Sequence, residues 1–241
     1  MSPPRAVFFD FAGTLFSARS LRDVHLRQLR FVGDAIGMAA SDDELRAAYR
    51  RGMRVAYRSI ATRPYYLHRE LFGQAFVEMA RALGGQLDPA TVDDLVDRQY
   101  QATFDSAALR ADCLATLRAL RARGLRLQVV SNIDDDQMDA LARRFRLDDE
   151  VDGWTTSEQA RSCKPDARIY QVALESAGCA AAEVLFVGDS PEHDVVGPRA
   201  QGMATALLVA EARRGAPDGA PDFVIERLGQ VVEIVERESV G

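Results

Sequence analysis

Lysine is almost absent from this chain of 241 residues, because 29 of its 30 basic residues are arginine and Lys164 is the one exception. Cysteine is also scarce. The three cysteines, Cys113, Cys163 and Cys179, form no CxxC pair, so we expect neither a disulfide framework nor a zinc knuckle. Positive charge is not in excess either. The net charge is −6, which argues against a general nucleic-acid-binding surface.

Two further absences concern membranes. No apolar run approaches the roughly 18 residues that a bilayer-spanning helix needs. Residues Met1 to Arg5 lack the cationic region and following apolar stretch of a signal peptide. We therefore expect a cytoplasmic protein that acts on a small anionic metabolite, without a nucleic-acid or membrane partner, as a monomer or homodimer.

Short apolar runs alternate with amphipathic stretches over most of the chain. Strands are predicted at residues 6–9, 125–130, 184–187, 204–209 and 222–225. Helices are predicted at residues 113–123, 137–144, 165–176, 193–201 and 228–237. This alternation predicts an α/β fold, with a parallel, Rossmann-like sheet covered by helices on both faces.

The stretch from about residue 21 to residue 100 has a different pattern. It predicts a series of amphipathic helices with little strand signal, punctuated by glycines such as Gly52 and by Pro89. We expect residues 19–105 to form an inserted helical cap. Residues 1–18 and 106–241 would then form the catalytic core.

Three of the predicted strands end in a polar residue, namely Asp10, Ser131 and Asp189. Each could simply cap the helix that follows it, because Asp and Ser favour that position. In an open parallel sheet, however, the carboxyl ends of the strands meet at one edge, where ligands bind. An Asp carboxylate can act there as a covalent nucleophile. Two carboxylates would also form an oxygen-rich site that suits Mg²⁺.

Other residues near these strand ends could bind a phosphate group. The Ser131 hydroxyl, the Asn132 amide and the turn at Gly13 could donate hydrogen bonds to phosphate oxygens. Lys164 could supply a fixed positive charge near the same oxygens. The residue types at this edge therefore predict phosphoryl transfer.

Four motifs, in this order, resemble those of the haloacid dehalogenase (HAD) superfamily. They are Asp-Phe-Ala-Gly-Thr-Leu at 10–15, Val-Val-Ser-Asn at 129–132, Lys-Pro-Asp at 164–166 and Gly-Asp-Ser-Pro-Glu-His-Asp at 188–194. The resemblance extends from Ala6 to about Val209, and the only lysine of the chain falls in the third motif. It implies a Rossmann-like core with a small helical cap inserted after the first strand.

The resemblance also implies a role for individual residues. Asp10 would be the nucleophile, and Mg²⁺ would be held by Asp10, the backbone carbonyl of Ala12 and Asp189. Asp194 would be a further carboxylate at the metal site, where it orients Lys164 or a metal-bound water. The remaining predicted site residues are Lys164 and Ser131 in catalysis, and Gly13, Thr14, Asn132, Arg54 and Arg58 in substrate binding.

The first motif departs from the family pattern at Ala12. Phosphatases of the family usually carry a second Asp at this position, which protonates the leaving group and then activates water. A methyl group does neither, and loss of a general acid/base typically removes about 10²–10⁴-fold of rate. The Ala12 carbonyl could still bind a metal. We therefore expect a good leaving group, or an acid from elsewhere.

Three alternatives accommodate Ala12. Phosphonoacetaldehyde hydrolases share Asp-x-Ala-Gly-Thr but need a cap lysine for a Schiff base, and arginine cannot replace it. Haloacid dehalogenases carry an aromatic residue at this position and lack the metal-binding Asp of the fourth motif, which Asp189 retains here. A catalytically impaired, phosphate-binding protein would keep the phosphate and metal site, whereas a fully decayed site would have no chemical reason to keep Lys164.

The expected cap contains arginines at every fourth position, namely Arg46, Arg50, Arg54 and Arg58. They would lie along one side of a helix and form either an anion-binding surface or an ordinary solvated face. His193, in the fourth motif, either replaces the missing proton carrier or starts the following helix.

Overall fold

The computed structural model describes residues 3–17, 22–60, 63–209 and 220–240. The chain divides into two compact units. Residues 1–17 and 108–241 form one, which we call the sheet unit. Residues 18–107 form the other, which we call the helical unit.

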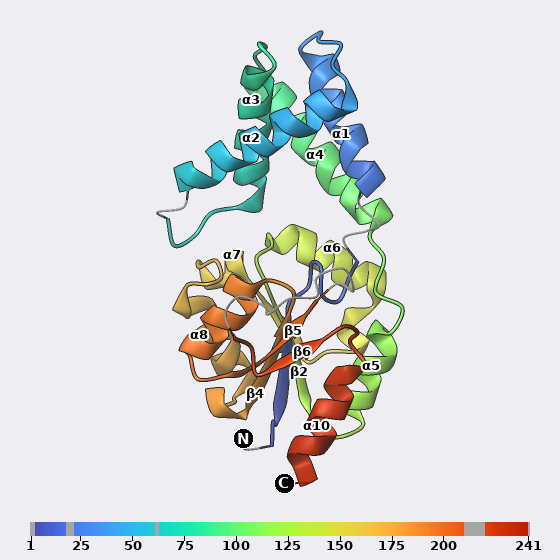
Figure 1. Cartoon of the computed structure of the whole chain (residues 1–241), viewed down its shortest axis with the longest axis vertical. Coiled ribbons are helices and arrows are strands. Elements are labelled where there is room, and N and C mark those ends of the chain that lie inside the picture. The colour runs from blue at the N-terminus through green and yellow to red at the C-terminus, as the bar shows by residue number, and fades with distance from the viewer. Residues whose placement is uncertain (1–2, 18–21, 61–62, 210–219, 241) are drawn as a thin grey trace. The chain divides into compact units, whose positions relative to one another are not determined.

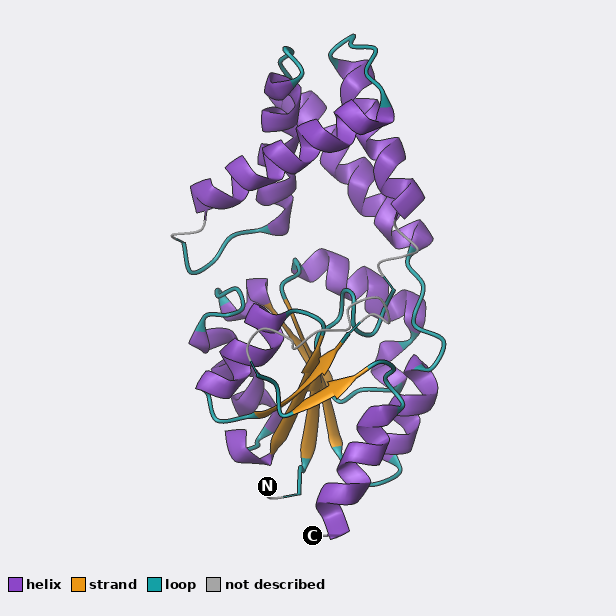
Figure 2. Cartoon of the chain, viewed as in Figure 1, coloured by secondary structure: helices purple, strands orange, loops and turns teal. Residues whose placement is uncertain are grey.

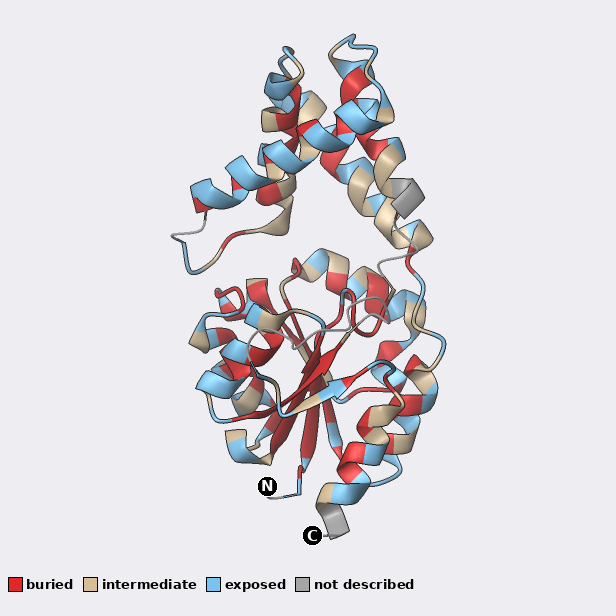
Figure 3. Cartoon of the chain, in the orientation of Figure 1, coloured by how far each residue is buried: buried red, intermediate tan, exposed pale blue. Residues whose placement is uncertain are grey.

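The sheet unit is built on six parallel strands in the order β3-β2-β1-β4-β5-β6 (Figure 1). They are β1 (Ala6–Phe9), β2 (Arg126–Ser131), β3 (Gly153–Thr156), β4 (Val184–Gly188), β5 (Ala204–Leu208) and β6 (Phe223–Ile225). Every residue of β1, β4 and β5 is buried, as expected for strands covered on both faces (Figure 3). The predicted α/β fold with a parallel sheet is confirmed.

Helices cover both faces of this sheet (Figure 2). The helices of the sheet unit are α5 (Cys113–Arg121), α6 (Asp135–Phe145), α7 (Ser157–Ala160), α8 (Ala167–Ala177), α9 (Gly197–Ala200) and α10 (Gln230–Val240). On one face, Ile169 and Tyr170 of α8 pack with Phe8 of β1 and Phe186 of β4 in a common apolar core. This burial fixes the strands whose ends carry the polar motifs.

Two local predictions were wrong. No strand was predicted at Gly153–Thr156, where the edge strand β3 pairs with β2. The helix predicted at residues 193–201 is instead a π-helix at Pro191–Val196, followed by the short α9. The other predicted helices and strands are present, with ends that differ by a few residues.

The helical unit consists of α1 (Arg22–Ala35), α2 (Asp42–Ile60), α3 (His68–Ala82) and α4 (Pro89–Ser106). It has an apolar core of its own, to which all four helices contribute, for example Leu29, Leu45, Phe76 and Leu95. Gly52 does not interrupt a helix, contrary to the prediction. It lies within α2, where a Cβ atom would come within 2.5 Å of the Ala75 carbonyl oxygen on α3.

No helix in the described part of the chain is long and apolar enough to cross a membrane.

Candidate active site

The register of the central strands brings three of the four motifs to one edge of the sheet. Phe9 of β1 lies opposite Val129 of β2 and Val187 of β4. Asp10 follows directly and donates its backbone N–H to the Val187 carbonyl at 2.9 Å. The chain then turns away, so the polar residues after each strand converge at this edge.

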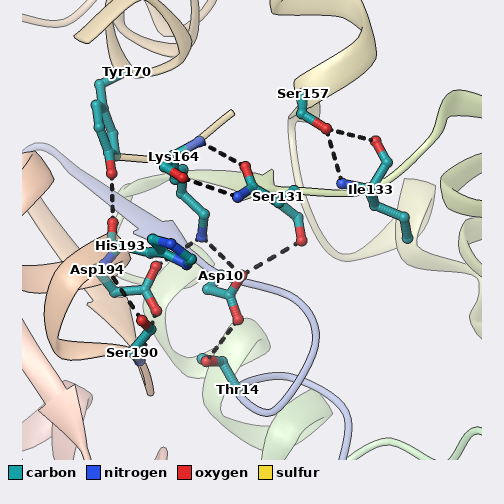
Figure 4. A network of polar contacts seen from close by, with 11 residues as sticks. Asp10, Thr14, Ser131, Ile133, Ser157, Lys164, Tyr170, Ser190, His193 and Asp194 are labelled. Atoms are coloured by element: carbon teal, nitrogen blue, oxygen red, sulfur yellow. Dashed lines mark hydrogen bonds and ion pairs between the residues drawn. The ribbon is translucent and has the colours of Figure 1, made fainter. Parts of the chain in front are cut away.

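Lys164 joins the third motif to this edge through two ion pairs. Its Nζ lies 2.8 Å from Asp10 Oδ1 and 2.7 Å from Asp194 Oδ1 (Figure 4). Burial alone would lower the pKa of Lys164, but the two carboxylates outweigh it and raise the pKa above its ordinary value. Lys164 is therefore charged in the folded protein and placed beside the predicted nucleophile.

The Asp10 carboxylate is oriented by further contacts. Thr14 Oγ1 donates a hydrogen bond to Asp10 Oδ2 at 3.0 Å, and Ser131 Oγ lies 3.4 Å from Oδ1 (Figure 4). Thr14 was predicted to bind substrate. Its side chain is fully buried, and its hydroxyl holds Asp10 in place.

An acidic cluster surrounds the nucleophile. Asp10, Asp189 and Asp194 each offer a carboxylate oxygen, and these oxygens lie within 4.8 Å of one another. Partial enclosure by the protein and the nearby Asp10 charge raise the pKa of Asp189 to about 6. Such excess negative charge fits a divalent cation with oxygen ligands, so the residues present suit Mg²⁺.

Two glycines make room for these carboxylates. Gly13 has a φ of +95°, and a Cβ atom there would lie 2.3 Å from Asp189 Oδ2. A Cβ atom at Gly188 would lie 2.2 Å from Asp194 Cγ. Both positions therefore require glycine for steric reasons, and Gly13 also requires it for its backbone conformation.

Asp194 differs from Asp189 in how its oxygens are used. Oδ1 pairs with Lys164, and Oδ2 accepts a hydrogen bond from the Ser190 backbone N–H at 2.9 Å. Asp194 is 1% exposed, whereas Asp189 is exposed. The arrangement therefore suits Asp194 for orienting Lys164 and leaves Asp189 open to a metal.

Asn132 holds the third motif in place. Its side-chain oxygen accepts a hydrogen bond from the Lys164 backbone N–H at 2.7 Å, and its Nδ2 donates to the Lys164 carbonyl at 3.1 Å. The oxygen and the nitrogen of the Asn132 side-chain amide both form hydrogen bonds with the Lys164 backbone. The Asn132 side chain therefore positions the lysine in this structure.

The other predicted positions lie around this centre or outside it. Ala12 is exposed in the loop after β1, and its methyl group carries no acid. Burial and the Lys164 charge lower the pKa of His193, so its ring is neutral at physiological pH. Arg54 and Arg58 belong to α2 of the helical unit and are exposed.

Sequence reasoning missed Arg110 entirely. Its Nη2 donates a hydrogen bond to the Gly13 carbonyl at 2.6 Å, although the two residues are 97 positions apart. No motif marks Arg110, and in an arginine-rich chain its residue type carries no signal.

Comparison with known proteins shows the same family across most of the chain. A family model for haloacid dehalogenase-like hydrolases matches residues 4–202. The chain is 28% identical to an (S)-2-haloacid dehalogenase of Pseudomonas sp. (strain YL), over 96% of this chain and 94% of the relative. It is 24% identical to a ribulose-1,5-bisphosphate 5-phosphatase of Halopiger xanaduensis, over 95% and 98%.

Solved structures share the fold. The magnesium-bound HAD-hydrolase YfnB of Bacillus subtilis superposes with a TM-score of 0.78 at 17% identity, covering 97% of this chain and 99% of that one. The family model, together with the four motifs that meet at this site, establishes that this chain belongs to the haloacid dehalogenase-like hydrolases.

Proposed function

We propose that this hydrolase is a Mg²⁺-dependent phosphatase that transfers a phosphoryl group from a small metabolite to Asp10 and then to water. The acidic cluster formed by Asp10, Asp189 and Asp194 carries this proposal. It provides oxygen ligands for a cation beside a nucleophile that Thr14 and Lys164 already orient. Asp10 and Asp189 would hold Mg²⁺ together with the Ala12 carbonyl.

The reaction would proceed in two displacements. The Asp10 carboxylate attacks phosphorus, the bond between phosphorus and the bridging oxygen breaks, and the leaving group departs as an oxyanion. Water then attacks the same phosphorus, which releases phosphate and restores Asp10. Lys164 and the Ser131 hydroxyl would stabilise charge on the transferring oxygens. Bound Mg²⁺ would supply charge neutralisation, which lets an anionic nucleophile approach an anionic substrate.

Ala12 determines which phosphates can react. No carboxylic acid at this position protonates the leaving oxygen, so the leaving group must be stable as an anion. An acyl phosphate or a similarly activated ester meets this condition. The predicted substrate contacts of Arg54 and Arg58, and the role of the helical unit as a cap, remain parts of this proposal.

Dehalogenation is the second candidate, and Ala12 together with the 28% identical dehalogenase favours it. In that reaction Asp10 would attack carbon and displace halide, which leaves without a proton. Asp189 favours the phosphatase instead, because it adds to the oxygen ligands beside Asp10 that suit a divalent cation.

The first experiment measures hydrolysis of acyl and aryl phosphates with and without Mg²⁺. It compares the wild type with Asp10→Asn and with Asp139→Asn, an exposed position on α6 outside the site. We expect Mg²⁺-dependent turnover that Asp10→Asn abolishes and Asp139→Asn retains. Equal turnover by the Asp10 variant would refute the covalent role.

The second experiment separates the two candidates by the fate of solvent oxygen. During a single turnover in ¹⁸O-water, a phosphatase places the label in phosphate, because water attacks phosphorus. A dehalogenase places it in the Asp10 carboxylate, because water attacks the ester carbon. Mass spectrometry of the peptide that contains Asp10 distinguishes these results, and a labelled peptide would reject the phosphatase.

A further inference from the structure

Arg110 is a charged residue outside the four motifs whose side chain reaches the loop that follows Asp10. It belongs to the sheet unit and lies at the start of the chain's return from the helical unit. Its Nη2 donates to the Gly13 carbonyl at 2.6 Å, and its backbone N–H donates to the Leu15 carbonyl at 2.9 Å. One residue therefore holds two successive parts of the loop that follows Asp10.

The loop that Arg110 holds sets the geometry of two predicted functional carboxylates. Thr14, next to Gly13, donates its hydroxyl to Asp10 Oδ2. Gly13 packs so closely on Asp189 that no Cβ atom fits between them. A shift of the Gly13 peptide would therefore move the hydroxyl that orients the nucleophile and the surface against which Asp189 rests.

The Arg110 side chain is half-buried beside this loop. The Nε of Arg110 is buried and has no hydrogen-bond partner in the described part of the chain. Packing alone would not require a half-buried arginine with one buried donor unused.

We propose that Arg110 is a positioning residue for the reaction at Asp10, which fixes the Asp10–Leu15 loop through the Gly13 carbonyl. Its kinetic consequence rests on the proposed phosphatase function, whereas its effect on the loop does not. Lysine would keep the charge but lose the planar fork, so Arg110→Lys is a partial replacement only.

The kinetic test compares Arg110→Ala with Arg199→Ala, whose arginine forms an exposed ion pair with Asp222. A displaced loop misorients the nucleophile without removing a substrate contact. We therefore expect kcat of Arg110→Ala to fall by about 10–100-fold while KM changes less than about threefold. Added methylguanidinium should restore part of kcat, and methylammonium should not. The Arg199 variant should match the wild type.

Hydrogen exchange tests the loop without a substrate. The N–H groups of Gly13, Leu15 and Phe16 are hydrogen-bonded to carbonyls of the same loop. In Arg110→Ala we expect them to exchange at least about tenfold faster than in the wild type and in Arg199→Ala. If Arg110→Ala does not fold, Arg110→Gln replaces it, because glutamine keeps a donor and loses the charge.

The outcomes are separable. Unchanged exchange would overturn the proposal whether or not the protein hydrolyses phosphates. A rise in KM at constant kcat would also overturn it, because Arg110 would then bind substrate. If the wild type has no phosphatase activity, the proposed function fails, and the exchange measurement alone decides the role of Arg110.

Discussion

The two units of the chain use cationic side chains in opposite ways. In the sheet unit, Lys164 is 3% exposed and contacts two carboxylates. On α2 of the helical unit, Arg50, Arg54 and Arg58 are exposed, and none forms an ion pair with another described residue. A buried charge stays with its partners because separating them costs free energy in the protein interior. An exposed charge is solvated by water and is not held in one position. The contacts of Lys164 therefore restrict its chemical role, whereas the surroundings of the α2 arginines do not restrict theirs.

Removing Lys164 should produce the largest effect. Lys164→Met leaves Asp10 and Asp194 buried without their cation, so we expect a loss of about 3–5 kcal/mol in the free energy of unfolding. Chemical denaturation measures it. The control is Arg199→Met, which breaks the exposed pair with Asp222 and should cost less than about 1 kcal/mol. Similar losses in both variants would remove the contrast between buried and exposed charge.

Restoring the missing acid should give the next largest effect. Ala12→Asp places a carboxyl group where the leaving oxygen would be protonated, so kcat for unactivated phosphate esters should rise about 10²-fold. For acyl phosphates, which need no proton, kcat should change little. Steady-state kinetics with both substrate types measures this difference. A uniform change would mean that Ala12 does not limit proton transfer.

The helical unit should respond to packing more than to charge. Gly52→Ala forces a methyl group against the Ala75 carbonyl, so we expect a loss of about 1–3 kcal/mol in unfolding free energy. Gly73→Ala on α3 is the matched control, because its methyl group would meet side chains and no backbone, namely Val92 at 3.2 Å and Val96 at 3.8 Å. Thermal unfolding of the two variants compares them. Equal Tm values would contradict the close approach of α2 and α3 at Gly52.

Stabilisation by Mg²⁺ should depend on pH. The raised pKa of Asp189, about 6, means that the metal-free folded protein holds this proton more tightly than the unfolded chain does. The contribution of Asp189 to the free energy of unfolding is therefore present below the pKa of the unfolded chain and is lost as pH rises through 6. Mg²⁺ requires the ionised form, so the increase in Tm on adding Mg²⁺ should grow from pH 5 to pH 7. An increase that is constant with pH would exclude Asp189 as a ligand.

The smallest effect is expected on α2. Arg54 has a like charge four residues away on each side, at Arg50 and Arg58. Arg54→Gln should therefore raise the free energy of unfolding slightly, by about 0.2–0.5 kcal/mol for each repulsive pair removed. Denaturation measures the change. A loss of stability would show that Arg54 has a structural partner, and a higher KM would support its predicted role in substrate binding.

The sequence was informative where residues depend on one another. Asp10 and Asp189 follow neighbouring parallel strands, and Lys164 lies in the third motif. The order of these motifs along the chain predicted that the three residues lie close together in the fold. The contact of Arg110 with Gly13 was not predicted, because the two residues are distant in sequence. β3 escaped because its four residues, which include Gly153 and Trp154, become a strand only through pairing with β2.

The roles of neighbouring residues were also less predictable than their presence. Thr14 and Asn132 were expected to bind substrate, and their side chains hold Asp10 and the Lys164 backbone. A motif specifies which residue types gather at a site. It does not specify which of several nearby acceptors each donor uses, because that depends on distances of a few tenths of an ångström.

The most direct measurement concerns Asp10 and the cation together, and it needs no known substrate. Beryllium fluoride binds an aspartate carboxylate as a mimic of aspartyl-phosphate, and ¹⁹F NMR detects the bound form. We predict bound ¹⁹F signals for the wild type in the presence of Mg²⁺, and none without Mg²⁺ or in Asp10→Asn. Absence of bound signals in the wild type, or their persistence in Asp10→Asn, would contradict a Mg²⁺-dependent phosphoryl transfer through Asp10.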